Sequence, residues 1–292
     1  VLEQVVGLNL SVCVVIVDVL TICYTFCGGM KAVVWNDCIQ FIVYMVGALA
    51  AATVIVGSLP GGWSQLAEFA GEEGKFRLFD FTFDLKLKYT FWSGLIGGIF
   101  LTLATHGTDQ LMVQRYLAAG SKRDAGRALA ISGFIVCGQF AVFLLIGVGL
   151  ACFYHLNPAE ATFSRPDEVF GRFIVDHLPV GIVGITVAAV FSAAMSTLSS
   201  SLNSSAAAAV NDLYLPTFKE APSDRHVLNV SRAFTVVFGL VQIAVAIAGQ
   251  GFSRSVVGDV LAIAGFTTGP ILGVFFLGVL TKWVSQRAAL VG

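Results

Sequence analysis

The chain has 292 residues and a formal net charge of −1, and 57% of its residues are hydrophobic while only 12% are charged. Because soluble domains carry about 25% charged residues, this composition excludes an ordinary soluble protein. It predicts an integral membrane protein whose helices cross a lipid bilayer. The near-neutral charge also argues against a nucleic-acid partner.

Seven apolar segments follow one another along the chain. They cover about residues 5–27, 34–57, 91–113, 126–154, 179–213, 230–249 and 256–281. Most of them reach the roughly 20 residues that a membrane-spanning helix needs. The first ends at Gly28-Gly29, and the third is interrupted by the polar stretch THGTDQ at 105–110. We therefore expect an all-α membrane protein with about seven transmembrane helices.

The loops between these segments alternate in their content of basic residues. Lys31, the stretch 115–127 and the stretch 219–232 place unbalanced Lys and Arg on one side, whereas loop 58–90 on the other side balances them with Asp and Glu. Short basic loops mark the cytoplasmic side of a membrane. We therefore predict a multi-pass protein of the plasma (inner) membrane with an extracellular loop at 58–90.

A row of hydroxyl side chains interrupts the fifth apolar segment at 193–210, AAMSTLSSSLNSSAAAAV. One helix face, by spacing, holds Ala193, Ser196, Thr197, Ser200 and Ser204. Small and hydroxyl residues of this kind are typical of a face where helices pack closely. They also suit a hard-cation site, because hydroxyl and carbonyl oxygens bind sodium without burying an anion. The spacing alone leaves both interpretations open.

Acidic and polar side chains occur at three further places inside the apolar segments. Asp18 lies in the middle of the first segment, where an acid is either functional or a neutral, hydrogen-bonded structural residue. Asp37 begins the second segment, a position that also suits a helix cap. Thr102, Thr105 and His106 precede the interruption of the third segment, and polar groups at membrane depth are tolerated where a helix breaks or lines a cavity.

The sequence contains none of the short motifs that mark common enzyme sites. It has no GxSxG, no HExxH and no glycine-rich phosphate loop, and its four histidines are scattered. We therefore predict that the chain is not an enzyme.

Three blocks of sequence point to a known family when they are taken together. They are GGMKAVVWNDCIQ at 28–40, GTDQLMVQRYLAA at 107–119 and AAMSTLSSSLNSSAAAAVNDLY at 193–214. In order and spacing they resemble the sodium:solute symporter family, whose members include sodium/glucose, monocarboxylate, iodide, multivitamin, proline and sialic acid transporters.

The resemblance implies the inverted-repeat fold of the bacterial leucine transporter, in which two five-helix repeats each begin with a broken helix. On that map, residues 1–57 are the last two helices of the first repeat, 58–90 are the extracellular loop and 91–292 are the second repeat. Core helices one to three are then expected to be absent from this chain.

The same resemblance implies a sodium-coupled secondary active symporter. Such a protein moves a small polar or anionic organic solute into the cell by alternating access, with Na+ as the coupling ion. The alternative is a membrane sensor module derived from the same fold, since some relatives carry this domain ahead of a signalling kinase.

Carried over from the family, the sodium ligands of this chain are the carbonyl of Ala193 and the hydroxyls of Ser196 and Thr197. Asp37 matches an aspartate of the family that lies near the same ion.

The solute positions carried over from the family are Thr102, Thr105 and His106 in the interrupted segment. Gln139, where the next segment enters the core, is a further candidate for binding solute. The aromatic gate of the sugar-transporting members has no counterpart among these residues, so a glucose-like solute is not favoured.

Overall fold

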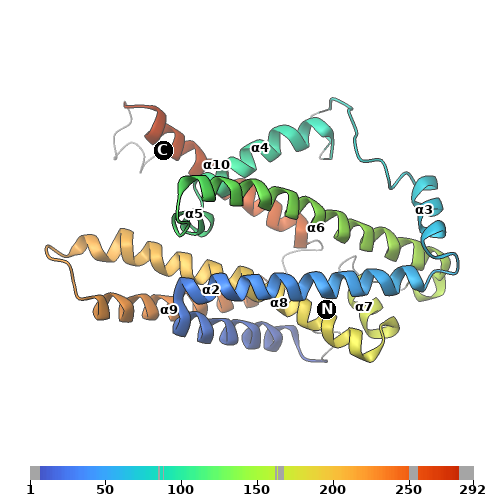
Figure 1. The fold of residues 1–292 in the computed structure, drawn as a ribbon, viewed down its shortest axis with the longest axis horizontal. Helices are drawn as coiled ribbons and strands as arrows, with labels where there is room; N and C mark the ends of the chain where they lie inside the picture. Colours follow the sequence, from blue (N-terminus) through green and yellow to red (C-terminus); the bar gives the residue numbers. More distant parts are fainter. Residues whose placement is uncertain are drawn as a thin grey trace. The chain divides into compact units, whose positions relative to one another are not determined.

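The computed structural model describes residues 7–84, 86–87, 89–161, 163, 168–249 and 256–282. Throughout these residues the regular structure is helical, which confirms the predicted all-α fold (Figure 1). The α-helices are α2 (Leu10–Gly57), α3 (Gly62–Glu72), α4 (Phe91–Gly107), α5 (Gln110–Leu117), α6 (Lys122–Leu156), α7 (Glu168–His177), α8 (Val180–Ala208), α9 (Asp224–Ala248) and α10 (Val256–Leu280). Short turns of 3₁₀-helix cover Pro158–Glu160 and Leu215–Thr217, and a π-helical turn covers Ala209–Tyr214.

Within the described ranges, six helical segments are long and apolar enough to cross a membrane. They are Leu10–Gly29, Lys31–Gly57, Lys122–Leu156, Val180–Thr217, Asp224–Ala248 and Ala262–Leu280. The remaining predicted segment corresponds to α4, which has 17 residues and ends at Gly107. The chain leaves the helix at Thr108 and Asp109 before α5 begins. The polar stretch in the sequence thus marks a real break between two short helices.

Helix α2 consists of two spans separated by a kink at Gly29. Its φ of 57° and ψ of −160° are not helical, and a residue without a Cβ adopts this conformation at little cost. Figure 1 shows the two halves of α2 running in opposite directions from the kink. The Gly28-Gly29 pair therefore ends the first span, as the sequence predicted.

Polar caps define where several of the helices begin. Asp109 Oδ1 accepts a hydrogen bond from the backbone N–H of Leu111 at 2.9 Å and so starts α5. Thr90 and Ser93 form a reciprocal capping box at the start of α4. Each cap satisfies backbone donors that have no partner within the helix, so these side chains fix the ends of the broken segment.

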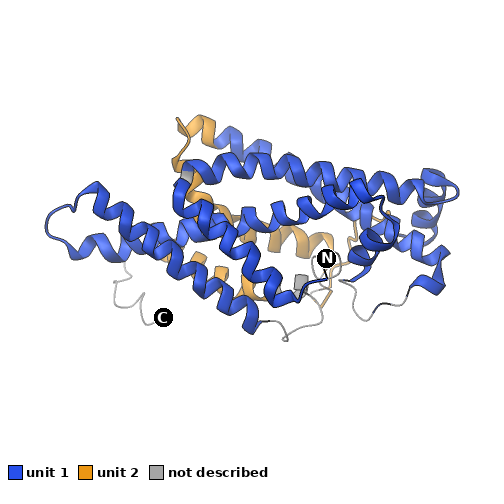
Figure 2. Cartoon of the chain, turned by 90° about the horizontal axis from the view of Figure 1, so that it is seen from below, with its two compact units in different colours: residues 1–75, 126–254 blue, residues 76–125, 255–292 orange. Residues whose placement is uncertain are grey.

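The chain divides into two compact units (Figure 2). The first contains residues 1–75 and 126–254, and the second contains residues 76–125 and 255–292. Within the first unit, α2 packs against both α8 and α9. Within the second unit, α4 packs against α10.

The buried core of the first unit lies where the end of α2 meets α3, α6 and α7. Ile55, Leu66, Cys152, Phe173 and Ile174 are almost completely buried there. They are hydrophobic side chains from four helices that contact one another, so their burial holds the ends of these helices together.

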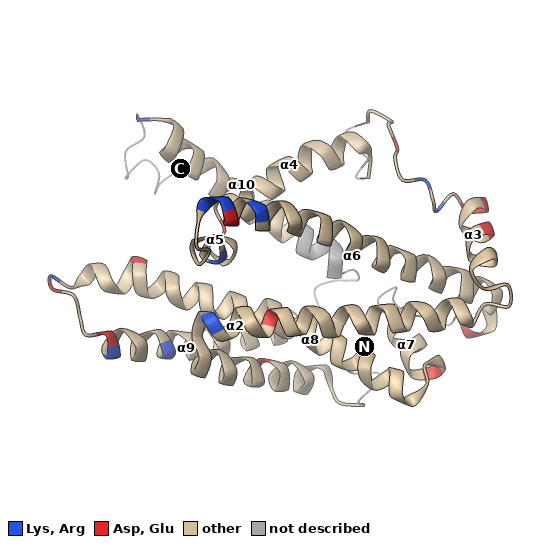
Figure 3. Cartoon of the chain, in the orientation of Figure 1, with Lys and Arg blue, Asp and Glu red and all other residues tan. Residues whose placement is uncertain are grey.

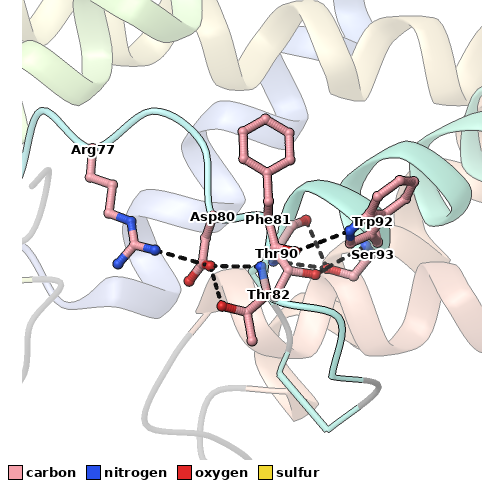
Figure 4. A network of polar contacts seen from close by, with 7 residues as sticks. All are labelled: Arg77, Asp80, Phe81, Thr82, Thr90, Trp92 and Ser93. Carbon is pink, nitrogen blue, oxygen red and sulfur yellow. Dashed lines mark hydrogen bonds and ion pairs between the residues drawn. The ribbon is translucent and has the colours of Figure 1, made fainter.

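The segment that leads into α4 is ordered by its own polar contacts (Figure 4). The carboxylate of Asp80 accepts hydrogen bonds from the hydroxyl and the backbone N–H of Thr82 at 2.6 and 3.0 Å, and Arg77 pairs with it at 3.1 Å. The indole N–H of Trp92 donates to the carbonyl of Phe81 at 3.2 Å. Helix α3 gives regular structure to part of the predicted loop 58–90, and these contacts hold the irregular segment around Asp80.

Candidate functional site between α2 and α8

The second half of α2 and the hydroxyl row of α8 meet at Asp37. The hydroxyl of Ser196 donates a hydrogen bond to Asp37 Oδ1 at 2.7 Å, and that of Ser200 donates to Asp37 Oδ2 at 3.3 Å. Asp37 is thereby in direct contact with two serines that lie 159 and 163 positions after it in the sequence. Asp37 thus accepts hydrogen bonds at both carboxylate oxygens, and it lies inside the second half of α2 and not at a helix end, so the helix-cap interpretation is wrong.

A close approach of the two helices makes this contact possible. A Cβ placed on Gly47 of α2 would lie 2.5 Å from the Cβ of Ala189 and 3.2 Å from the carbonyl of Ile185. Small residues allow helix backbones in a membrane to come this near to each other. The short side chains of Ser196 and Ser200 then reach Asp37 without a long polar arm crossing the apolar region.

Ala193 and Thr197 lie one turn apart on the same helix. The hydroxyl of Thr197 points back at the carbonyl of Ala193, with an oxygen–oxygen distance of 3.4 Å. Both residues are exposed in the described structure, whereas Ser196 is half-buried. The carbonyl of Ala193 and the two hydroxyls are therefore close together on one face, and the Ser196 hydroxyl also contacts Asp37.

Other serines of the row satisfy their own helix. Ser199 donates to the carbonyl of Ser196, and Ser204 donates to that of Ser201, both at 3.1 Å. Ser199 and Ser204 are buried, and back-bonding of this kind is typical of serines in membrane helices. The two interpretations of the row thus apply to different members, because Ser196 and Ser200 contact Asp37 while Ser199 and Ser204 pack.

The donor set fits a hard monovalent cation. Hard cations prefer carboxylate, hydroxyl and carbonyl oxygens, and these are the groups that Asp37, Ser196, Thr197 and Ala193 present. In the part of the chain that the structure describes, no group of three or more His, Cys, Asp or Glu side chains is placed to hold a metal ion. The oxygen atoms that these four residues present are of the kind that could hold a sodium ion.

Tyr24 adds a contact that the sequence did not predict. Its hydroxyl donates to the carbonyl of Met195 at 3.0 Å and so joins the first half of α2 to α8, next to Ser196. Its place in the first apolar segment gives no sign of this partner, because the partner lies 171 residues away. Ser200 was predicted to share the hydroxyl face, but not to contact Asp37.

An apolar cavity of about 340 Å³ lies beside the sodium candidates within the first unit. Ala193, Tyr44 and Phe143 are among its lining residues. The hydroxyl of Tyr44 donates to Gln139 Oε1 at 2.8 Å. Gln139, a predicted solute residue, is thus joined to a residue that lines this cavity.

The other predicted solute residues lie at the end of α4 in the second unit. Thr102 is exposed, and the hydroxyl of Thr105 donates to the carbonyl of Leu101 at 2.9 Å. The ring Nδ1 of His106 pairs with the hydroxyl of Tyr116 in α5. These three residues share one turn next to the helix break, and Thr105 and His106 have local partners.

The chain is similar to known proteins of one family. The sequence model of the sodium:solute symporter family matches residues 1–292. The chain is 32% identical over 302 residues to the sodium-dependent multivitamin transporter of Oryctolagus cuniculus, covering 100% of this chain and 46% of that protein. It is 32% identical over 298 residues to the sodium-coupled monocarboxylate transporter 1 of Homo sapiens, covering 100% of this chain and 48% of that protein.

A solved structure also matches. It is described as the substrate-bound outward-open state of a Na+-coupled sialic acid symporter with a novel Na+ site. The TM-score is 0.83 and the identity 28%, over 98% of this chain and 59% of the other. The chain thus spans about half the length of the curated relatives named above. It is an integral membrane protein with the leucine-transporter-like fold, the relatives' names confirm the prediction that it is not an enzyme, and it belongs to the sodium:solute symporter family.

Proposed function

We propose that this protein is a sodium-coupled symporter that moves a small organic solute into the cell by alternating access. The observation that carries the proposal is the contact of 2.7 Å between Ser196 of α8 and Asp37 of α2. It brings a carboxylate to the hydroxyl row inside an apolar helix pair, where a cation supplies the missing positive charge. Family membership and the sodium-dependent relatives support the same function.

Sodium is then a co-transported substrate, held by the carbonyl of Ala193, the hydroxyls of Ser196 and Thr197, and Asp37. A hydroxyl group has both a donor hydrogen and acceptor lone pairs. Ser196 donates to Asp37 in the described structure, and rotation about its C–O bond turns a lone pair towards an ion. Sodium binding therefore needs little movement of the helix backbone.

The proposed solute is small and polar or anionic. Monocarboxylate and sialic acid, in the names of two similar transporters, are organic acids, which favours an anionic solute. Thr102, Thr105, His106 and Gln139 remain the proposed solute residues. Because sodium and solute are coupled, binding of either one raises the affinity for the other.

The proposed organisation follows the inverted-repeat map. Residues 1–57 form the last two helices of the first repeat, 58–90 the extracellular loop and 91–292 the second repeat. The proposed location is the plasma membrane, with the basic loops in the cytoplasm. The transporter names of the relatives give the sensor alternative no support.

The test is uptake into proteoliposomes that contain the whole natural protein. Labelled monocarboxylates, sialic acid, sugars, amino acids and vitamins are offered with an inward sodium gradient or with potassium in its place. We expect uptake of one solute class, and only with the sodium gradient. Correctly folded protein that takes up no solute in a sodium-dependent way would contradict the proposal.

A further inference from the structure

Both halves of α2 contact the same turn of α8. The hydroxyl of Tyr24, in the first half, donates a hydrogen bond to the carbonyl of Met195 at 3.0 Å. Asp37, in the second half, accepts a hydrogen bond from the hydroxyl of Ser196 at 2.7 Å. The kink at Gly29 separates Tyr24 from Asp37 along the chain, yet their contacts fall on consecutive residues of α8. The beginning of the hydroxyl row is therefore held by both halves of α2.

The carbonyl that Tyr24 contacts belongs to the same peptide unit as the Cα of Ser196. A peptide unit is planar and stiff, so its carbonyl oxygen and the following Cα move together. The hydrogen bond from Tyr24 to the oxygen of Met195 thus limits how far α8 can rotate or shift at Ser196. The contact of Tyr24 therefore orients a proposed sodium ligand, although it is made to the preceding residue.

Helix α8 brings no ionised side chain to this contact. Residues 180–211 contain no Asp, Glu, Lys, Arg or His, and Figure 3 shows the middle of α8 without acidic or basic residues. The orientation of the hydroxyl row against α2 thus depends on packing and on hydrogen bonds whose α8 partners are neutral. Because a hydrogen bond is stronger in an apolar interior than in water, we expect the loss of one hydroxyl to have a measurable effect here.

The first half of α2 is itself held in place by α9. The Nε–H of Arg232 donates to the carbonyl of Phe26 at 3.2 Å, and the Cζ of Arg232 lies 5.2 Å from the centroid of the Phe26 ring. A Cβ placed on Gly239 would lie 2.4 Å from the Cδ1 of Ile22, so the two helices approach closely there. Tyr24 lies between Ile22 and Phe26 in the sequence. Its backbone is therefore anchored on both sides, which suits a residue that supports a binding site.

We propose that Tyr24 is a positioning residue of the sodium site. Its hydroxyl fixes the orientation of Ser196 and so raises the affinity for sodium, while the ion itself is bound by other groups. The inference rests on the proposed function, because it assigns Tyr24 to the proposed sodium site. Groups that orient the ligands of a metal ion typically change its affinity by about 10- to 100-fold when they are removed.

The test is the binding of radioactive sodium to the purified whole natural protein. Tyr24→Phe removes the hydroxyl and keeps the ring. We expect the sodium concentration for half-maximal binding to rise about 10-fold, while the solute concentration for half-maximal uptake at saturating sodium stays unchanged. The matched control is Tyr214→Phe, which removes a hydroxyl that pairs with His226 at 2.7 Å at an exposed site. This control is expected to bind sodium as tightly as wild type.

A combination with Ser196→Ala tests whether Tyr24 acts through Ser196. If it does, Tyr24→Phe causes no further loss of sodium affinity in the Ser196→Ala protein, within the roughly twofold scatter of independent mutations. The same loss in both backgrounds would show that Tyr24 acts on the ion directly or through another group. That result would overturn the proposal.

Thermal unfolding separates positioning from a purely structural role. Without sodium, we expect Tyr24→Phe to unfold at about the same temperature as Tyr214→Phe, since each variant loses one hydrogen bond of a tyrosine hydroxyl. A Tyr24→Phe protein that does not fold, or that binds sodium as tightly as wild type, would overturn this inference alone. A wild-type protein that binds no sodium would contradict the proposed function as well.

Discussion

Asp37 and Asp18 lie in the two halves of one kinked helix, yet their surroundings differ in kind. Asp37 accepts hydrogen bonds from Ser196 and Ser200 of α8. Asp18 is buried, and its Oδ1 lacks a donor among the described residues. The packed partner helix therefore decides what a carboxyl in the membrane can do. Hydroxyl donors suit an ionised group ready for a cation, whereas burial without a donor disfavours the charged form of a carboxyl.

Removal of the carboxylate at Asp37 is expected to have the largest effect. Asp37→Ala takes away the charged oxygen ligands and leaves the hydroxyls of Ser196 and Ser200 without their acceptor. We expect sodium affinity to fall by about 100-fold, the upper end of the range seen when a group that supports a metal site is lost. The measurement is the sodium dependence of uptake, with Asp212→Asn as the control. An unchanged sodium dependence would remove Asp37 from the site.

Substitutions at two glycines test how tightly each half of α2 packs against its neighbouring helix. Gly47→Ala places a Cβ against Ala189 and the backbone of α8, whereas Gly239→Ala meets only the side chain of Ile22. Because side chains yield more readily than backbone, we expect Gly47→Ala to destabilise the protein more, by about 1–3 kcal/mol. Thermal unfolding in lipid or detergent measures both.

Gly184→Ala serves as the control for this pair, since a Cβ there has no atom within 4 Å among its described surroundings. Adding Ile22→Ala, which removes the side-chain atoms that a Cβ at position 239 would meet, is expected to restore the stability of the Gly239→Ala protein. A Gly239→Ala protein as unstable as Gly47→Ala, and not rescued, would contradict the difference between the two contacts.

A smaller effect is expected from Thr197→Ala, which deletes one proposed hydroxyl ligand. We expect the sodium concentration for half-maximal uptake to rise about 10-fold, with little change in solute affinity at saturating sodium. Thr53→Ala is the matched control, because Thr53 is also an exposed threonine that donates to its own helix. An equal loss of sodium and solute affinity would show that Thr197 has a structural role and does not bind the ion.

Asp80, a third aspartate, extends the comparison to a segment outside the membrane-spanning helices. The hydroxyl and backbone N–H of Thr82, with Arg77 nearby, lower the pKa of Asp80 below its usual range. A lowered folded-state pKa gives stability that is present above the unfolded pKa and is lost as pH falls through the folded value. The contacts of Asp80 should therefore persist from neutral pH to below about 4, the ordinary pKa of aspartate.

The fluorescence of Trp92, which is tied to Phe81 in the same network, measures this loosening during acid titration. Thr82→Val removes the hydroxyl donor and is expected to move the transition to higher pH. A transition that Thr82→Val leaves in place would show that the Thr82 hydroxyl does not lower this pKa.

The sequence predicted much of the fold because local patterns carry that information. The Gly28-Gly29 pair predicted the end of the first span, and THGTDQ predicted the break after α4. The spacing of Ser196 and Ser200 predicted that they share a face. Each of these features depends on residues within a few turns of one another.

Contacts between distant segments could not be predicted from local patterns. Ser196 and Asp37 are 159 residues apart, and Tyr44 and Gln139 are 95 residues apart. Spacing along one helix says which residues share a face but not which helix covers that face. The family resemblance placed Asp37 near the ion, whereas the contact of Tyr24 with the carbonyl of Met195 followed only from the packing of α2 against α8.

The measurement that tests the account most directly is the binding of radioactive sodium to the purified whole protein. Wild type is compared with Ser196→Ala and with Ser205→Ala, whose serine lies about two and a half turns away on the opposite face of α8. The account predicts saturable sodium binding in wild type and Ser205→Ala, and much weaker binding in Ser196→Ala. Equal binding in all three proteins would contradict a sodium site between Asp37 and the hydroxyl row.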